Sequence, residues 1–298
     1  RAIARALGVP WVADFRDPWT DGPRRRRSYE NNRPRERIEK AAERWVIRHA
    51  DRVVVSAAPL RDRFLKKYPF LGPDRIHVLT NGFDPDDFEM EEVAEPLLEP
   101  GRFHLVGTGN IEAMFDRRPF YRAVAALIRE DEGIGRDLYV TLVGAKKGPN
   151  QEDLRSLGLE DRIRYPGWVP HARSVRYLHE ADALIMCQLP HDGGGGEKLS
   201  GKCFEYLNMR KPILSLTVPG LNADLLRETG LGRIVDPFDA EGIQSALREL
   251  YAHRGEKPPV VEEVISRFDR RLLTERLAAI FDELVSPAER GAAHEARP

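Results

Sequence analysis

Residues 183–206 read ALIMCQLPHDGGGGEKLSGKCFEY and contain three consecutive structural signals. The apolar run at 183–189 predicts a buried parallel strand, four glycines follow at 193–196, and a helical pattern of apolar residues begins near Ser200. A strand, a glycine-rich loop and a helix start bring backbone N–H groups and the positive end of a helix dipole to one point. Such a point is suited to a phosphate group.

Two carboxylates bracket this point, Glu197 in the loop and Glu205 about one turn into the predicted helix. A carboxylate there can accept hydrogen bonds from both hydroxyls of a ribose while phosphates lie at the helix start. The alternative is that the glycines form a mobile loop and that the spacing of the two Glu residues is a coincidence in a charged chain. These residues alone leave both interpretations open.

Length and composition predict a globular chain of one large or two medium domains. The 298 residues are 41% hydrophobic and 32% charged, with a formal net charge of −1, so no global field draws the chain to nucleic acid or to a membrane. The two cysteines, Cys187 and Cys203, do not make a disulfide framework, and no apolar run is long enough to span a bilayer. We therefore expect a cytoplasmic protein that does not bind nucleic acid.

From residue 101 onward, apolar runs alternate with helical patterns, which predicts a parallel α/β sheet covered by helices on both faces. The expected strands are 102–107, 137–143, 161–165, 182–188, 212–217 and 232–235, and the expected helices are 119–130, 151–157, 170–180, 200–209, 220–229 and 239–252. In an open doubly wound sheet, ligands bind at the carboxyl ends of the strands. Glycines follow four predicted strands, at 107–110, 144–147, 167–169 and the central loop, so we expect these segments to share one edge.

The first hundred residues predict a smaller α/β part and a linker. The expected strands are 9–15, 51–56 and 76–80, and the expected helices are 34–49 and 59–68. Asn81-Gly82 favours a sharp turn, and residues 85–100, rich in Pro and Glu, read as a linker. The first strand leads into Arg16-Asp17, for which a role in a binding cleft and a structural ion-pair knot with Asp14 both remain open.

The run from Ser200 to Leu207, followed by Lys211-Pro212, resembles the signature of GT-B glycosyltransferases, in particular the family 4-like group (glycosyl transferases group 1). Glu197 and Glu205 have the Glu, seven residues, Glu spacing of that group. The resemblance implies two Rossmann-like doubly wound domains. Because the chain lacks an initial Met and starts in what reads as the tail of a helix, we expect the first domain to be truncated.

The resemblance also implies the domain boundaries. They are a partial N-terminal, acceptor-side domain at 1–84, a linker at 85–100, a C-terminal nucleotide-sugar-binding domain at 101–255, helices crossing back at 256–286 and a disordered tail at 287–298.

The implied reaction is transfer of a sugar from a nucleotide diphosphate sugar to a carbohydrate or lipid-linked acceptor, with retention of configuration and without a metal or other cofactor. Such enzymes serve the synthesis of cell-surface polysaccharides and glycans. Glu205 would hold the ribose, Glu197 the hydroxyls of the donor sugar, and Lys202 with an arginine the diphosphate. The implied residues are, for catalysis, Glu197, Arg16 and Asp17 and, for the donor, Glu205, Lys202, Arg117, Arg118, Gly109, Gly195, Gly196, Ser200, Gly201, Gly167 and Trp168.

The chain departs from the family pattern at Arg16, where many family 4 enzymes have a His. A guanidinium can bind phosphate or carboxylate, but it does not act as a base near neutral pH. The basic run at 23–27 is either a solvated face or, because acceptors in this family are often lipid-linked, a contact with anionic lipid at the inner face of the membrane.

Two other functions fit the same architecture. A nucleotide-sugar epimerase would need pairs of His and carboxylate groups, for which His171 and His191 are the candidates. A non-catalytic nucleotide-sugar-binding or assembly module would keep the sheet without turnover.

Overall fold

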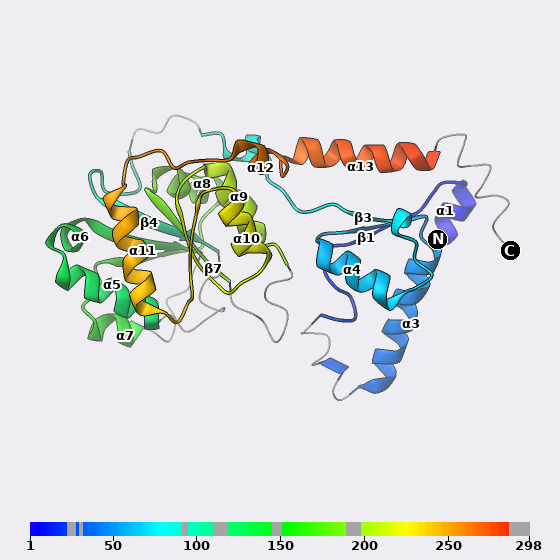
Figure 1. Ribbon diagram of the computed structural model, residues 1–298, viewed down its shortest axis with the longest axis horizontal. Helices are drawn as coiled ribbons and strands as arrows, with labels where there is room; N and C mark the ends of the chain where they lie inside the picture. Colours follow the sequence, from blue (N-terminus) through cyan, green and yellow to red (C-terminus); the bar gives the residue numbers. More distant parts are fainter. Residues whose placement is uncertain are drawn as a thin grey trace. The chain divides into compact units, whose positions relative to one another are not determined.

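A computed structural model of the chain describes residues 1–22, 28–29, 32–90, 95–109, 118–144, 151–188 and 198–285 (Figure 1). The chain divides into two compact units. The first comprises Arg1–Gly82, a short stretch that ends at Leu199, and the chain from Phe268 onward, whereas the second comprises Phe83–Pro190 and Ser200–Arg267. Each unit contains its own parallel sheet, which confirms the predicted α/β fold class.

The first unit contains a three-stranded parallel sheet in the order β1-β2-β3. Its elements are α1 (Ala2–Leu7), β1 (Val12–Phe15), α3 (Arg33–His49), β2 (Arg52–Val55), α4 (Ala58–Lys67), a 3-10 turn η1 (Pro73–Arg75) and β3 (Ile76–Val78). The β-branched residues of β2 are at most 1% exposed, as expected for a central strand covered on both faces. Phe64 of α4 and Ile47 of α3 complete this core.

The C-terminal region, for which helices were expected at 256–286, forms α12 (Glu262–Ser266) and α13 (Arg270–Val285), which Figure 1 draws in succession. Leu273 of α13 packs with Val54 and Leu79 of the first unit. Gly82 lies so close to this segment that a Cβ would be 2.2 Å from the carbonyl oxygen of Phe268. The close backbone approach therefore requires glycine at this position.

The second unit contains a six-stranded parallel sheet in the order β6-β5-β4-β7-β8-β9. Its strands are β4 (Phe103–Thr108), β5 (Leu138–Val143), β6 (Ile163–Gly167), β7 (Ala183–Gln188), β8 (Ile213–Thr217) and β9 (Gly232–Val235). Its longer helices are α5 (Arg118–Glu130), α8 (His171–Glu180), α9 (Gly201–Met209), α10 (Leu221–Glu228) and α11 (Ala240–Ala252), with the shorter α6 (Glu132–Asp137) and α7 (Gln151–Ser156). The predicted elements of this region thus correspond to observed ones, with ends that differ by at most two residues.

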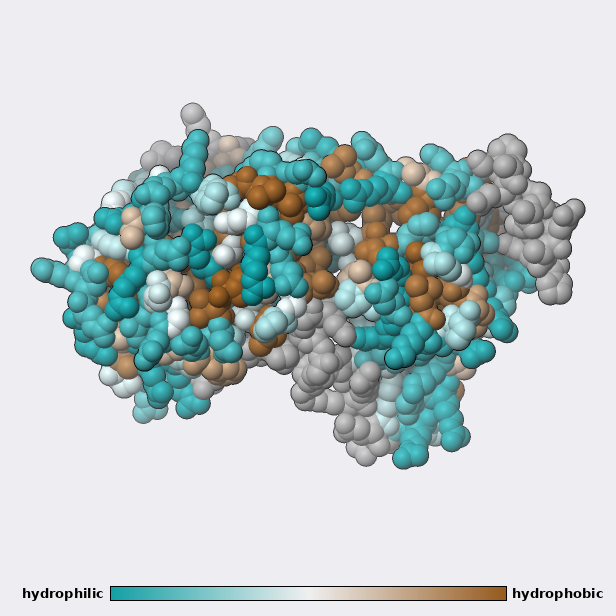
Figure 2. Space-filling view, viewed as in Figure 1, coloured by the Kyte–Doolittle hydropathy of each residue, from teal (hydrophilic) through white to brown (hydrophobic). Residues whose placement is uncertain are grey.

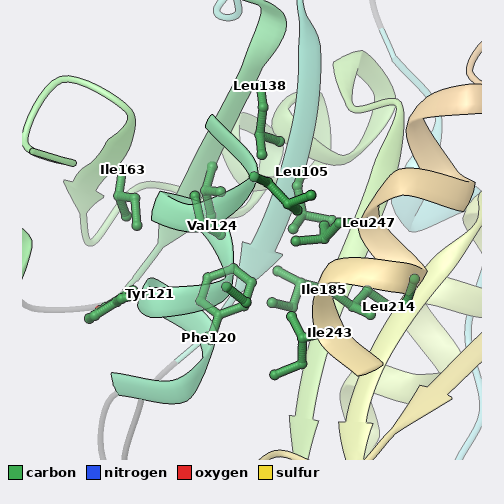
Figure 3. Packing of buried hydrophobic residues seen from close by; sticks show 14 of the residues in the cluster. Leu105, Phe120, Tyr121, Val124, Leu138, Ile163, Ile185, Leu214, Ile243 and Leu247 are labelled. Carbon is green, nitrogen blue, oxygen red and sulfur yellow. The ribbon is translucent and has the colours of Figure 1, made fainter. Parts of the chain in front are cut away.

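One face of this sheet packs against α5 and α11. Figure 3 shows Phe120 and Val124 of α5 beside Ile185 of β7, with Leu247 of α11 completing the cluster. Alternate residues of the strands point to the opposite face, where α8, α9 and α10 contact β4, β7, β8 and β9. Helix α6 was not predicted. Its N-cap is Asp131, whose Oδ1 accepts a hydrogen bond from the N–H of Ile134 at 2.9 Å.

The described part of the expected linker packs on the second unit. Residues Pro85–Phe88 form a 3-10 turn, η2, and the N–H groups of Leu97 and Leu98 donate to Oε2 of Glu180 at 2.7 and 2.8 Å. These contacts lie within the second unit, which begins at Phe83.

The surface seen in Figure 2 is mostly hydrophilic, in keeping with the charged composition. Among the residues that the structure describes, no helix combines the length and apolar character needed to cross a membrane. The basic run at 23–27, Lys146-Lys147 and the tail at 287–298 lie outside the described residues.

Candidate functional site

Three glycines at the carboxyl ends of adjacent strands form one backbone surface, which we call the glycine edge. Gly109, Gly144 and Gly167 follow or end β4, β5 and β6, with φ angles of 93°, 83° and 75°. Gly144 donates to the carbonyl of Gly167 at 2.7 Å, and a Cβ on Gly144 would lie 3.4 Å from the Cα of Gly109. Positive φ favours glycine at all three positions. At these three positions the edge therefore consists of backbone without side chains.

Helix α9 brings two of the predicted residues to this edge. Nζ of Lys202 lies 2.7 Å from Oε2 of Glu205, and the two side chains are 38% and 31% exposed. A Cβ on Gly109 would lie 3.2 Å from Cε of Lys202, so the lysine stem crosses the end of β4. The structure thus brings Lys202, and with it Glu205 of the same helix turn, to Gly109, which is distant from both in the sequence.

Tyr206 attaches α9 to β4 beside the glycine edge. Its hydroxyl accepts a hydrogen bond from the N–H of Thr108 at 2.7 Å. The ring is 1% exposed, and burial raises the pKa of Tyr206 to about 12. The phenol therefore stays protonated at neutral pH. Sequence reasoning missed this residue, although a tyrosine on the buried face of a helix generally needs a hydrogen-bond partner.

The start of α9 is held from outside the helix. The N-cap residue Ser200 makes no side-chain capping bond, and its N–H donates to Oδ1 of Asn222 at 2.9 Å. Gly201 is the first helical residue, so Glu205 lies about one turn into the helix, as the sequence predicts. Lys202 lies in the first turn.

Two further predicted donor residues have exposed side chains in the second unit. Trp168 follows Gly167 and is 84% exposed, so its ring is not a packing element at the end of β6. Arg118 is the first residue of α5 and is exposed.

Arg16 and Asp17 lie in the first unit, directly after β1. Both Nε and Nη2 of Arg16 lie 2.8 Å from Oδ2 of Asp14, and Nη1 donates to the carbonyl of Leu79 at 3.0 Å. The structural ion-pair interpretation therefore describes Arg16 and Asp14. Asp17 forms an ion pair with Lys198 instead.

Lys211 of the Lys-Pro motif has a structural role at the end of α8. Its Nζ donates to the backbone carbonyls of His179 and Ala181 at the end of α8, and burial lowers its pKa. A cation there complements the negative end of the helix dipole. Lys211 thus satisfies backbone carbonyls at the carboxyl end of α8.

Several predicted residues cannot be placed. Glu197, Arg117, Gly195, Gly196 and His191 lie outside the described residues. Within the part of the chain that is described, no group of three or more His, Cys, Asp and Glu side chains is arranged to hold a metal ion.

Comparison with known protein families gives two matches that together cover most of the chain. The model of the family described as glycosyl transferases group 1 matches residues 102–253, and that of glycosyltransferase family 4 matches residues 1–87. Both agree with the resemblance that the sequence motifs indicated.

Curated relatives have related descriptions. A lipopolysaccharide core biosynthesis glycosyltransferase of Rhizobium meliloti is 28% identical over 197 residues, which cover 62% of this chain and 50% of that protein. A D-inositol 3-phosphate glycosyltransferase of Saccharomonospora viridis is 27% identical over 277 residues, which cover 88% of this chain and 62% of that protein. The chain thus spans between half and two-thirds of the length of these relatives.

Solved structures share the fold. The Anabaena protein HepE in complex with UDP aligns with a TM-score of 0.65 at 14% identity, covering 95% of this chain and 75% of that one. WaaG, a glycosyltransferase involved in lipopolysaccharide biosynthesis, aligns with a TM-score of 0.59 at 16% identity, covering 92% and 75%.

Proposed function

The chain belongs to the glycosyl transferases of group 1, and on this premise we propose that it transfers a sugar from a nucleotide diphosphate sugar to a carbohydrate or lipid-linked acceptor. The observation that carries the proposal is the cluster of Lys202 and Glu205 beside the backbone of Gly109. A cation, a carboxylate and partly exposed backbone lie there, at the carboxyl edge of a doubly wound sheet, which is the usual ligand edge of such folds.

Glu205 is the proposed ribose-binding residue. Its Oε2 accepts from Lys202, and Oε1 has no hydrogen-bond partner among the described residues. An ionised carboxylate has room for further donors, so two vicinal hydroxyls can bind while the lysine contact is retained or exchanged. Because both side chains are partly exposed, water can replace the contact between them at a small cost in free energy.

Lys202 is the proposed contact to the diphosphate. The ammonium group has three N–H donors, and one is used by Glu205. In the reaction, negative charge develops on the leaving nucleoside diphosphate, and a fixed cation at the start of a helix stabilises that charge. Arg117 or Arg118 would add a second cation, and these side chains rather than a metal ion would neutralise the leaving group.

The remaining roles follow the family resemblance. Trp168 would stack on the nucleotide base, for which its exposed ring is available. Glu197 would bind hydroxyls of the donor sugar, and Arg16 with Asp17 would contribute on the acceptor side. Retention of configuration is part of the same proposal.

Contact with a membrane is proposed for the case of a lipid-linked acceptor. Helix α3 carries six Lys or Arg residues against three Glu residues, and Ile38 and Trp45, which lie two turns apart, are 69% and 47% exposed. A basic helix with exposed apolar residues can bind peripherally to anionic lipid. Sedimentation with vesicles of anionic and of neutral lipid would test this, because equal binding to both vesicles would contradict it.

The experiment that tests the donor proposal is calorimetric titration of the chain with UDP, GDP, ADP and the matching nucleosides. UDP is the first probe because the Anabaena relative binds it. We expect one base to bind best and its diphosphate to bind more tightly than its nucleoside. Equal binding of diphosphate and nucleoside would contradict the assignment of Lys202.

Turnover separates an enzyme from a binding module of the same fold. Release of nucleoside diphosphate from a matching nucleotide sugar, measured with and without carbohydrate acceptors, should increase when the acceptor is present. Tight binding without any release would favour the non-catalytic module.

A further inference from the structure

Asn222, near the start of α10, contacts both ends of the segment that joins β7 to α9. Its Oδ1 accepts from the N–H of Ser200 at 2.9 Å, and its Nδ2 donates to Oε1 of Gln188, the last residue of β7. Asn222 is only 2% exposed. One buried amide therefore joins the chain at Gln188 to the chain at Ser200, across residues 189–199.

The Gln188 end of this link is held twice. Gln188 is paired with Thr217 in the register of β7 and β8, and Oγ1 of Thr217 donates to the carbonyl of Gln188 at 3.1 Å. Thr217 is 4% exposed. Buried polar groups of this kind are stable only when they are bonded, so a satisfied cluster favours one arrangement of its members over others.

The position of Ser200 matters because α9 carries the candidate donor residues. Ser200 is the N-cap of α9, and its own side chain makes no capping bond. Tyr206 holds the same helix to Thr108 of β4. Anchors at Ser200 and Tyr206 therefore bracket Lys202 and Glu205, and two anchors on a short helix restrict both its translation and its rotation.

We propose that Asn222 is a positioning residue of the donor site, which holds α9 so that Lys202 and Glu205 meet the glycine edge. The inference rests on the proposed function for its nucleotide readout. The amide is chemically suited to this place because one of its atoms accepts from an N–H while the other donates to a side-chain oxygen. An aliphatic side chain at this position makes neither bond.

The test compares three substitutions in the full chain. Asn222→Ala removes the link, Gln188→Met removes one arm at similar volume, and Thr229→Val is the matched control. Thr229 lies at the other end of α10, is fully buried and donates from Oγ1 to the carbonyl of Leu226 at 2.9 Å. The control therefore loses a buried hydrogen bond of the same helix away from the donor site.

We expect Asn222→Ala to weaken binding of the best nucleoside diphosphate by about tenfold, the scale of one to two hydrogen bonds. Thr229→Val should leave binding unchanged at a comparable loss of thermal stability. After Asn222→Ala, adding Gln188→Met should change binding less than about twofold, because both residues act through one link. Equal effects of Asn222→Ala and Thr229→Val, or full additivity of the first two substitutions, would overturn the proposal.

Two further measurements test the proposal if Asn222→Ala does not fold or if the unmodified chain binds no nucleotide. If Asn222→Ala does not fold, Gln188→Met against Thr229→Val decides the same question. If the unmodified chain binds none of the nucleotides, the proposed function fails, and amide hydrogen exchange at Ser200 still tests the anchor. Exchange at Ser200 should accelerate about tenfold in Asn222→Ala and not in Thr229→Val, and unchanged exchange would overturn the anchor.

Discussion

The two units contain lysine–glutamate pairs of nearly equal length in different surroundings. In the first unit, Nζ of Lys67 lies 2.6 Å from Oε1 of Glu43, which is fully buried. In the second unit, Nζ of Lys202 lies 2.7 Å from Oε2 of Glu205, and both side chains are about one-third exposed. The distances alone do not tell these pairs apart.

The hydrogen bonds around each pair distinguish them. Glu43 also accepts from the hydroxyl of Tyr68 at 2.5 Å and from the N–H of Thr20 at 2.9 Å, and Lys67 also donates to Asp21 at 2.8 Å. Burial and the bond to Glu43 raise the pKa of Tyr68 well above its usual range. Glu205, in contrast, bonds only to Lys202 among the described residues.

The difference indicates which pair supports folding and which can bind a ligand. A buried charge whose bonding capacity is filled resists change, because removing one partner leaves the other unpaired away from water. An exposed pair contributes little to stability and can exchange partners. We therefore assign the Lys67–Glu43 pair to the fold and the Lys202–Glu205 pair to the donor site.

The largest expected effect comes from the buried pair. Glu43→Leu, which preserves volume, should lower the free energy of unfolding by about 3–5 kcal/mol, because Lys67, Tyr68 and Thr20 lose their shared acceptor. Urea unfolding measures this. Glu205→Gln serves as the control and should change stability by less than about 0.5 kcal/mol. Similar losses in the two variants would remove the distinction between the pairs.

The next effect concerns ligand binding at the exposed pair. Glu205→Gln swaps one acceptor oxygen for a donor, so one ribose hydroxyl loses its partner, and nucleotide binding should weaken by about 1.5–3 kcal/mol. Titration with the 2′,3′-dideoxy nucleotide is the control, because that ligand has no hydroxyl to lose. If Glu205→Gln binds both nucleotides as the unmodified chain does, the ribose assignment is wrong.

The lysine of the exposed pair should affect the diphosphate alone. Lys202→Met should weaken nucleoside diphosphate binding by about 1.5–3 kcal/mol, the range for bonds to charged groups, and leave nucleoside binding unchanged. The matched control is Lys40→Met, since Lys40 forms a comparable exposed helical pair with Glu36 at 2.6 Å in the first unit. Calorimetry that finds equal losses for both ligands would contradict a phosphate contact.

The glycine edge should be sensitive to a single methyl group. Gly109→Ala combines strain at positive φ with contact to Lys202, so we expect a stability loss of about 1–3 kcal/mol together with weaker diphosphate binding. Gly101→Ala is the matched control, because Gly101 has a φ of 79° and nothing within 4 Å of its Cβ position. That variant should lose stability but retain binding, and retained binding in Gly109→Ala would refute the proximity argument.

The smallest expected effect is the dependence on salt concentration, which should differ between the exposed pair and the buried pair. Salt weakens exposed charge interactions, and the screening length falls from about 10 Å at 0.1 M to about 3 Å at 1 M. Diphosphate binding should therefore weaken as salt is raised, whereas the stability difference between Glu43→Leu and the unmodified chain should change little. The two measurements need only titration and urea unfolding at both salt concentrations.

Much of the second unit could be predicted from local patterns. Strand β7 and helix α9 can be predicted from the apolar runs and the glycines between them. The spacing of apolar residues that identifies each element lies within a short stretch of sequence. Helix α6 was missed, since its glycines, Gly133 and Gly135, argue against a helix on propensity. Helices were also predicted at 256–286, where the structure contains α12 and α13.

The sequence alone determined the family, the α/β class and the identity of Lys202 and Glu205 as candidates, because these depend on residue type and short spacing. Tertiary structure decided what each residue contacts. Three residues have roles that depend on distant partners: Asn222 bonds to Ser200, Tyr206 to Thr108, and Lys211 to carbonyls at the end of α8. The local spacing of residues in the sequence does not indicate these partners. The physical reason is that hydrogen bonds between distant segments depend on how strands are ordered in the sheet, and only folding brings those segments together.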